Sequence, residues 1–192
     1  MRLSLVAIML DEEEHVPRWL AGVRRLDGVF DDILVVDGGS QDGTVPLLTE
    51  HGVQVVHRPF GLDFSEQRNF GTRQVLGDWI AVLDADEILS VPLLGGLRTI
   101  LRAAQESEID CIGVPRLNFH DHILQPGPGH RGLDYQYRFF QRHCVWQGKV
   151  HEEVVGFKAR LELSLGDGHF IQHLKSTRRH EERNALYQRM QT

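Results

Sequence analysis

Aliphatic runs and helix-like segments alternate along the first hundred residues. Four runs favour strands, and the run at 79–83 has the unbroken apolar character of a strand that is buried on both faces of a parallel sheet. These runs cover residues 3–9, 33–36, 53–57 and 79–83. Four segments favour helices, and they cover residues 12–26, 44–51, 64–76 and 91–104. This alternation predicts an α/β fold with one doubly wound, mostly parallel sheet flanked by helices.

The pattern changes after residue 108. Residues 111–119 and 135–140 favour strands, and a loop rich in Pro and Gly lies between them at 125–132. A further short strand is expected around 170–171, followed by a charged surface helix. No linker or repeat divides the chain, so we expect a single domain over 1–192. Its parts are a nucleotide-binding half (1–107), a smaller strand and loop region (108–173) and a C-terminal helix (174–192).

Composition narrows the classes of protein. The 192 residues are 41% apolar and 25% charged, which is typical of a globular domain. The net charge of -6 argues against a nucleic-acid-binding protein, although the segment 175–183 is locally basic. Two distant cysteines fit a reducing compartment, and no apolar run reaches the roughly 18 residues of a membrane span. We therefore expect a cytoplasmic protein, with peripheral attachment to the inner membrane face through the basic tail as an alternative.

Acidic residues follow three of the predicted strands. Asp11 comes after the first strand, Asp37 after the second, and the pair Asp84 and Asp86 after the fourth. Ligands of open α/β sheets bind at the carboxyl ends of the strands. Two carboxylates in an Asp-x-Asp pattern there suit a hard divalent cation, while a plain polar turn is the alternative.

Other familiar motifs are absent. The sequence contains no G-x-x-x-x-G-K-[ST] loop for phosphate binding. Residues 127–132 formally match G-x-G-x-x-G, but they contain Pro and do not follow the first strand, so a dinucleotide site is rejected. His151 and Glu152 do not form a zinc-protease motif, because position 155 is Val.

Four segments in order resemble the family-2 glycosyltransferases of the GT-A fold. They are residues 36–44 (VDGGSQDGT), 64–71 (FSEQRNFG), 83–87 (LDADE) and 146–152 (WQGKVHE). The last segment is similar to one bacterial and phage branch, which includes lipopolysaccharide-core glucosyltransferases and peptide S-glycosyltransferases. The resemblance covers most of residues 3–173. It implies that 1–107 binds a nucleotide-sugar and that 108–173 forms the acceptor side.

The resemblance also implies roles for individual residues. A nucleoside-diphosphate sugar, with UDP-sugar favoured, would be bound by Asp11, Glu13, Asp37, Arg68, Asp84, Ala85 and Asp86. Mn²⁺ or Mg²⁺ would be held by Asp86, Asp84 and His173. The implied reaction inverts the anomeric carbon, and it needs a base near the acceptor hydroxyl. The candidate base is Glu152, with Asp134 and Asp121 as substitutes.

Several of these residues also have an ordinary structural role as an alternative. Arg68 can pair with an acid, Asp42 can cap the helix that follows it, and His173 can be structural. Glu152 can be a surface carboxylate or can pair with Lys149 or Arg138. The branch usually begins its first loop with Asn, and here that position is Asp11, which lacks the amide donor.

Several functions remain open at this point. The favoured one transfers a sugar to a hydroxyl of a glycan, a lipid-linked saccharide or a protein. A sugar nucleotidyltransferase fits less well, because the acidic residues 11–14 would repel a triphosphate. A non-catalytic nucleotide-binding or assembly module of the same fold is another alternative, as is a glycosyltransferase that acts on modified DNA bases.

Overall fold

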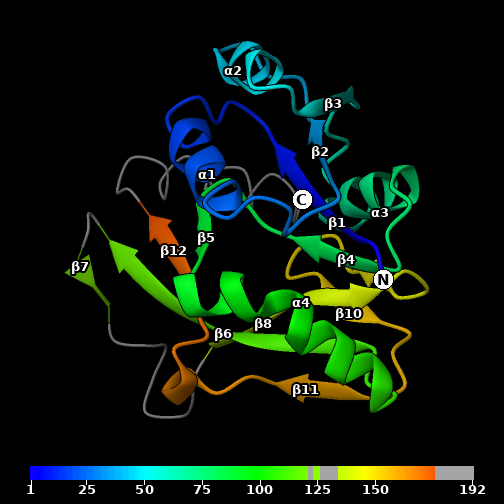
Figure 1. Ribbon diagram of the computed structural model, residues 1–192. Coiled ribbons are helices and arrows are strands. Elements are labelled where there is room, and N and C mark those ends of the chain that lie inside the picture. The colour runs from blue at the N-terminus through cyan, green and yellow to red at the C-terminus, as the bar shows by residue number, and fades with distance from the viewer. Residues whose placement is uncertain (121–122, 126–133, 176–192) are drawn as a thin grey trace.

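The computed structural model describes residues 1–120, 123–125 and 134–175. One large mixed sheet runs through the molecule, with helices on both of its faces (Figure 1). The predicted loop 125–132 lies almost entirely outside the described residues, as do the basic tail beyond Lys175 and most of the C-terminal helix expected at 174–192. Leu174 and Lys175 belong to a strand rather than to that helix.

The amino-terminal half forms the parallel part of the sheet. Its four strands are β1 (Leu3–Met9), β2 (Asp32–Asp37), β3 (Gln54–His57) and β4 (Trp79–Val82). They lie side by side in the order β3-β2-β1-β4, and each neighbouring pair is parallel. The carboxyl ends of these strands therefore meet at one edge, as the apolar runs predicted.

The second half of the chain extends the sheet in a mixed manner. Beyond β4 the order continues β8-β6-β12-β5, where β8 is antiparallel to both of its neighbours. The strands are β5 (Glu87–Leu89), β6 (Cys111–His120), β7 (Ile123–Leu124), β8 (Asp134–Gln141), β11 (Arg160–Glu162) and β12 (Ile171–Lys175). A separate hairpin pairs β9 (Val145–Gln147) with β10 (Glu153–Val155), and a short 3-10 turn, η1 (Leu165–Asp167), precedes β12.

Two apolar cores lie on the two faces of the sheet. Helices α1 (Val16–Val23), α2 (Thr44–Glu50) and α4 (Val91–Glu106) contribute buried residues to the first core, and α3 (Phe64–Gln74) covers the second. Strand β4 contributes side chains to both cores, because Trp79 and Ala81 lie in the first core while Ile80 and Val82 lie in the second. This two-sided burial explains the unbroken apolar run in the sequence.

Helix α3 packs very closely on the sheet. A Cβ atom at Gly71 would lie 2.7 Å from Val6 and 2.8 Å from Val36, so only glycine fits there. The side chain of Asp63 caps the helix by accepting the N–H of Glu66. The close approach fixes the position of the neighbouring α3 residues relative to the carboxyl edge.

Helix α1 is shorter than the predicted segment 12–26. The carbonyl of Glu12 accepts the N–H groups of His15 and Val16, and these bonds close a turn before the helix begins at Val16. Pro17 lies at the start of the helix, where its missing N–H costs nothing. The acidic residues 12–14 therefore lie in a loop at the carboxyl edge of the sheet. Within the described ranges, no helix has both the length and the apolar character needed to cross a bilayer.

Candidate functional site

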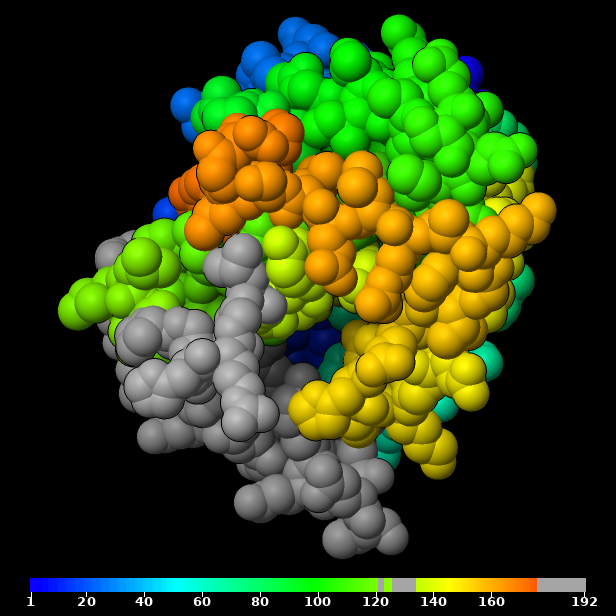
Figure 2. Space-filling view, turned by 90° about the horizontal axis from the view of Figure 1, so that it is seen from below, coloured from blue at the N-terminus to red at the C-terminus, as the bar shows by residue number. Residues whose placement is uncertain are grey.

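A large cavity opens at the carboxyl edge of the parallel strands. Its volume is about 1310 Å³, and its lining comes from the β1–α1 loop, α3, the segment after β4, and strands β6, β8, β10 and β12. Figure 2 shows the molecule hollowed beside the yellow segment, with blue amino-terminal residues visible at the floor. Most of the candidate site residues line it: Asp11, Glu13, Arg68, Asp84, Ala85, Asp86, Asp134, Glu152 and His173.

Asp37 lies just behind the lining. Its carboxylate is buried and accepts hydrogen bonds from the N–H groups of Gly39 and Ser40 and from His57 Nδ1, at 3.0–3.1 Å. Burial alone would raise the pKa of this carboxyl group, but these hydrogen bonds outweigh it and lower the pKa. Asp37 therefore fixes the turn after β2, and its neighbour Gly38 faces the cavity.

The acidic first loop is tied to the turn after β2. Asp11 Oδ1 accepts the N–H of Gln41 at 2.7 Å, and Glu13 Oε2 accepts the N–H of Gly43 at 2.7 Å. Asp11 has a left-handed backbone with φ of 53°, a conformation that Asp and Asn adopt more readily than most residues. An asparagine oxygen would accept the same bond, so Asp11 preserves this link between the loops. Asp42 accepts the N–H of Thr44 at 2.9 Å, but the N-cap of α2 is Gly43, so Asp42 is not the capping residue that was expected.

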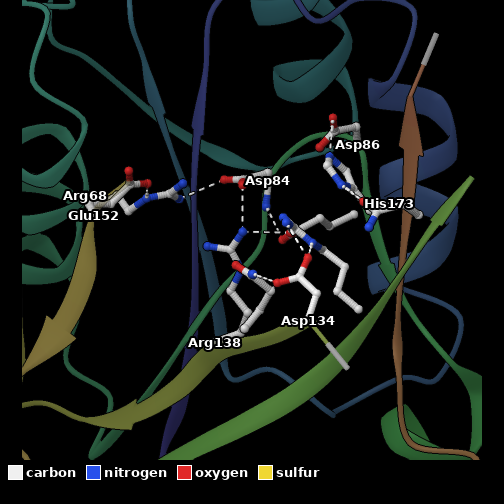
Figure 3. A network of polar contacts seen from close by, with 11 residues as sticks. Arg68, Asp84, Asp86, Asp134, Arg138, Glu152 and His173 are labelled. Atoms are coloured by element: carbon white, nitrogen blue, oxygen red, sulfur yellow. Dashed lines mark hydrogen bonds and ion pairs between the residues drawn. The ribbon is translucent and has the colours of Figure 1, made fainter. Parts of the chain in front are cut away.

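A chain of alternating charges crosses the floor of the cavity (Figure 3). It links acids and arginines over distances of 2.7–3.6 Å, in the order Glu152, Arg68, Asp84, Arg138, Glu87, Arg116 and Asp134. Four carboxylates meet three guanidinium groups, so the chain carries a net charge of -1. Its two ends are the carboxylates that the sequence nominates as the base.

Asp84 is the centre of this chain. Its Oδ1 lies 2.7 Å from Arg68 Nη1, and its Oδ2 lies 2.7 Å from Arg138 Nη2. Burial would raise the pKa of Asp84, but the two arginines outweigh it and hold the pKa far below its ordinary value. Both carboxylate oxygens are therefore already engaged, and the arginine pairing expected as an alternative for Arg68 is present.

Arg138 owes its position to a β-bulge. The register between β6 and β8 pairs Ile112 with Phe139 and Gly113 with Tyr137, which leaves Arg138 as the extra residue. Its guanidinium contacts Asp84 and also Glu87, whose side chain is fully buried. Glu87 Oε2 in turn accepts the N–H of Asp84 at 3.2 Å, so Glu87 braces the turn that carries the Asp-x-Asp pair.

Asp86 faces His173. His173 Nε2 lies 3.0 Å from Asp86 Oδ2, and His173 Nδ1 lies 2.7 Å from Asn118 Oδ1. Because an amide oxygen only accepts, the Nδ1–H must donate to Asn118. The second ring nitrogen, Nε2, then meets the Asp86 carboxylate at ion-pair distance. Two acceptors that face each other at this distance need a proton or a cation between them.

The two candidate bases differ in their surroundings. Glu152 Oε1 accepts a hydrogen bond from Arg68 Nε at 2.8 Å. Its hydrogen-bond partner is therefore Arg68, and not Lys149 or Arg138, which were the expected structural alternatives. Asp134 binds Arg116 through Oδ2 and accepts from Gln136 through Oδ1, which engages both oxygens. Asp121 lies outside the described residues.

The motif residues next to Arg68 hold the Glu152 segment in place. The side-chain amide of Asn69 donates to the carbonyl of Trp146 at 2.8 Å and accepts its N–H at 2.9 Å. The Arg68 guanidinium lies 5.0 Å from the centre of the Trp146 ring. Together with Gly71, these contacts give each position of the Arg-Asn-x-Gly pattern a physical role.

Several residues of the site were not predicted from the sequence. They are Glu87, Arg116 and Asn118, while Arg138 was expected only as a possible partner of Glu152. Charged residues inside otherwise apolar strands were the available signal, because a buried charge needs a partner. Within the described part of the chain, no group of three or more His, Cys, Asp or Glu residues is arranged to hold a metal. Asp84 therefore does not join Asp86 and His173 in a ready-made metal cluster.

Comparison with known proteins places the sequence among glycosyltransferases. The profile of glycosyl transferase family 2 matches residues 4–166. The glycosyltransferase SunS encoded by an SPbeta prophage of Bacillus subtilis is 27% identical over 161 residues, covering 82% of this chain and 36% of SunS. An uncharacterized glycosyltransferase of Rickettsia conorii is 27% identical over 125 residues, which are 65% of this chain and 43% of that protein.

A TPR repeat-containing protein of Synechococcus elongatus is more similar over a shorter stretch, with 43% identity over 100 residues. Those residues are 52% of this chain and 24% of that protein, so the chain spans between 24% and 43% of the length of the curated relatives described. The fold matches S. aureus TarS 1-349 in complex with UDP-GlcNAc, with a TM-score of 0.61 at 14% identity, covering 91% of this chain and 59% of TarS.

Proposed function

Because the chain belongs to glycosyl transferase family 2, we propose that it transfers a sugar from a UDP-sugar to an acceptor hydroxyl. The proposed donor is supported by the TarS structures of the same fold, which were determined with UDP and with UDP-GlcNAc. In this proposal the nucleotide lies along the β1–α1 loop and the turn after β2. The diphosphate points toward Asp86 at the carboxyl edge of β4, and the acceptor enters from the side of β8 and β10.

The observation that carries the proposal is the contact between Asp86 and His173. Ligands of a transition-metal cation lie about 2.0–2.2 Å from it, and two such ligands at a right angle are about 3 Å apart. The 3.0 Å between Asp86 Oδ2 and His173 Nε2 fits this spacing. The bond from His173 Nδ1 to Asn118 fixes the tautomer in the way that partners of metal-bound histidines commonly do.

We therefore propose that Asp86 and His173 would hold Mn²⁺ or Mg²⁺ beside the diphosphate of the donor. The bound cation supplies Lewis-acid stabilisation of the charge on the departing diphosphate. The imidazole ligand favours Mn²⁺ over Mg²⁺, since Mg²⁺ prefers oxygen ligands. Asp84 does not fit as a direct ligand, because Arg68 and Arg138 occupy both of its oxygens.

The proposed base is Glu152. Its carboxylate accepts the proton of the acceptor hydroxyl while that oxygen attacks the anomeric carbon of the donor, and the bond to the UDP oxygen breaks. Attack from the face opposite the leaving group inverts the anomeric carbon. Only one oxygen of Glu152 has a hydrogen-bond partner in the described structure, whereas both oxygens of Asp134 are engaged. Glu152 is preferred for this reason, and Asp134 is the substitute.

The loop that carries Glu152 has an unusual backbone. His151 has a left-handed conformation with φ of 56°, which few non-glycine residues adopt, although His adopts it more often than most. Such local strain persists where the surrounding structure enforces it, and it concentrates at functional sites. Here the contacts that hold the loop are the two hydrogen bonds between Asn69 and Trp146 and the ion pair between Arg68 and Glu152.

UDP release from a panel of UDP-sugars tests the proposal, first with water and then with saccharide and peptide acceptors. We expect Mn²⁺-dependent release that falls by about 10²–10⁴ in Glu152→Gln, because the amide cannot accept the proton. Asp27→Asn, an exposed residue near the end of α1, is the matched control and should retain full activity. UDP binding without any turnover would instead favour the non-catalytic nucleotide-binding module.

A further inference from the structure

The hairpin that carries Glu152 is separate from the main sheet. Strands β9 and β10 form a two-stranded sheet of their own, and residues 148–152 connect them. Glu152 is the last residue of this connection, directly before β10, and it lines the cavity. The position of the proposed base therefore depends on the contacts that hold the hairpin against the rest of the molecule.

Helix α3 holds the first strand of the hairpin and the connection. Asn69 makes two hydrogen bonds with the backbone of Trp146 on β9. The N–H of Phe64 donates to the carbonyl of Lys149 in the connection at 3.1 Å. Strand β10 follows β9 through antiparallel pairing. The far end of β10 is held by a different group.

Asp110 closes the root of the hairpin, where the chain enters β9 and leaves β10. Its Oδ1 accepts the backbone N–H groups of Lys158 and Ala159, which follow β10, both at 3.0 Å. Its Oδ2 accepts the Lys158 N–H at 2.9 Å and lies 3.2 Å from Nε2 of His143, which precedes β9. A single carboxylate thus contacts the chain just before and just after the hairpin.

Asp110 lies at the amino edge of the sheet, at the opposite end from the cavity. It directly precedes β6, whose first residue pairs with Phe140 near the end of β8. Its side chain is only 5% exposed. Burial alone would raise the pKa of Asp110, but the hydrogen bonds from the two backbone N–H groups and from His143 outweigh it and lower the pKa. This buried acid is therefore ionised at neutral pH, although the proposed chemistry does not use it.

From this arrangement we infer that Asp110 is a positioning residue for the base Glu152, because it closes the root of the hairpin whose connection carries that base. This role rests on the proposed function and extends it to the opposite edge of the sheet. Closing the two ends of a loop restricts the conformations of the residues between them. The bonds to Trp146 fix β9 and the bonds to Asp110 fix the exit of β10, so Glu152 is kept at the cavity.

The kinetics of Asp110→Ala and Asp110→Asn test this role, measured as UDP release with the UDP-sugar and acceptor that wild type uses. Asparagine keeps one oxygen for the two backbone N–H groups, whereas alanine removes every side-chain contact. A misplacement of about 1 Å by a change far from the chemistry can cost about 100-fold in rate. We expect kcat to fall about 10- to 100-fold in Asp110→Ala and by a smaller factor in Asp110→Asn, with the donor KM and the UDP affinity unchanged.

Asp31 supplies a matched control at the same edge of the sheet. Its carboxylate accepts the N–H of Leu3 at 2.7 Å, and its own N–H donates to the Leu3 carbonyl at 2.8 Å, just as the N–H of Asp110 donates to the carbonyl of Ala159 at 3.1 Å. Asp31 secures the start of β1 and not the hairpin. Asp31→Ala should therefore lower the midpoint of thermal unfolding but keep the wild-type kcat at temperatures well below that midpoint. The same outcome in Asp110→Ala would show that Asp110 only stabilises the fold, and it would overturn the inference.

Hydrogen exchange gives a second readout that needs no turnover. Removal of the Asp110 contacts should speed exchange of the amides of residues 145–155 at least about fivefold, the factor for one ordinary hydrogen bond, and leave the amides of β1 unchanged. Unchanged exchange of the hairpin would overturn the inference. If Asp110→Ala does not fold, the same two measurements on Asp110→Asn decide it, and wild-type values of both would overturn it. Full activity of Glu152→Gln would instead count against the proposed function, whereas the exchange rates would still report whether Asp110 holds the hairpin.

Discussion

Replacing Asp84 with alanine should destabilise the fold, because it removes the carboxylate that lies between Arg68 and Arg138. Their side chains are only 5% and 4% exposed, so neither can turn to water without rearrangement. Removing one partner of a buried ion pair typically costs about 3–5 kcal/mol. The cost here should lie near the lower limit, about 3 kcal/mol, because each arginine keeps a second carboxylate and Asp84 itself is 28% exposed.

The neighbouring Asp86 supplies the matched control. It contacts His173 at the cavity, and its side chain is 14% exposed. Asp86→Ala should cost about 1 kcal/mol, less than Asp84→Ala, because its contact with His173 is a single hydrogen bond whereas Asp84 lies between two buried guanidinium groups. The two carboxylates of one Asp-x-Asp motif should thus separate into one that mainly supports the fold and one that mainly binds ligand.

Thermal unfolding followed by circular dichroism measures the difference. For a domain of this size, 1 kcal/mol shifts the midpoint by about 2–4 °C, so Asp84→Ala should lower it by about 6–12 °C and Asp86→Ala by no more than about 4 °C. Equal midpoints for wild type and Asp84→Ala would refute the role of Asp84 as the centre of the charge chain. A larger loss in Asp86→Ala than in Asp84→Ala would reverse the assignment.

Three further changes test other parts of the structure. Gly71→Ala should cost about 1–3 kcal/mol, because the new methyl group would lie 2.7–2.8 Å from Val6 and Val36. The urea midpoint measures this cost. Gly96→Ala in α4, where the nearest side-chain atom lies 3.6 Å from the new Cβ, controls for replacing a helical glycine without crowding. Asp37, Asp84 and Asp110 have lowered pKa values in the fold, so the stability that their ionised forms contribute is present above about pH 4 and is lost as the pH falls further. The urea midpoint should therefore fall between about pH 5 and about pH 3. The fall should be smaller in Asp84→Ala than in wild type. Burial raises the pKa of Cys111 to about 12 and that of Cys144 to about 11, so a thiol reagent at pH 8 should modify neither cysteine until denaturant is added.

The sequence predicted the parallel half of the fold well. The four predicted runs became β1 to β4. Strands β1, β2 and β4 are largely buried, as apolar runs of this kind favour, whereas β3 at the edge of the sheet is only partly buried. The boundary of α1 was less predictable. Residues 12–15 have helix-compatible side chains, but their backbone closes a separate turn at the cavity rim. Local propensity does not report such a constraint.

The site was predictable only in part. Asp86, Glu152 and His173 follow from motif and strand position, whereas Arg138 contacts Asp84 across 54 positions of sequence. Its direction depends on a bulge in β8, which alters the alternation that strand patterns assume. The resemblance also grouped Asp84 with the metal ligands, and its two arginine partners become visible only in three dimensions.

The central claim is that Asp86 and His173 bind a divalent cation together with the diphosphate of a UDP-sugar. Isothermal calorimetry of UDP binding, with and without Mn²⁺, tests it most directly on wild type, Asp86→Asn and the control Asp27→Asn. The account predicts that Mn²⁺ strengthens UDP binding at least about tenfold in wild type and the control, and that this gain disappears in Asp86→Asn. Equal Mn²⁺ dependence in Asp86→Asn and wild type, or UDP binding that ignores Mn²⁺, would contradict it.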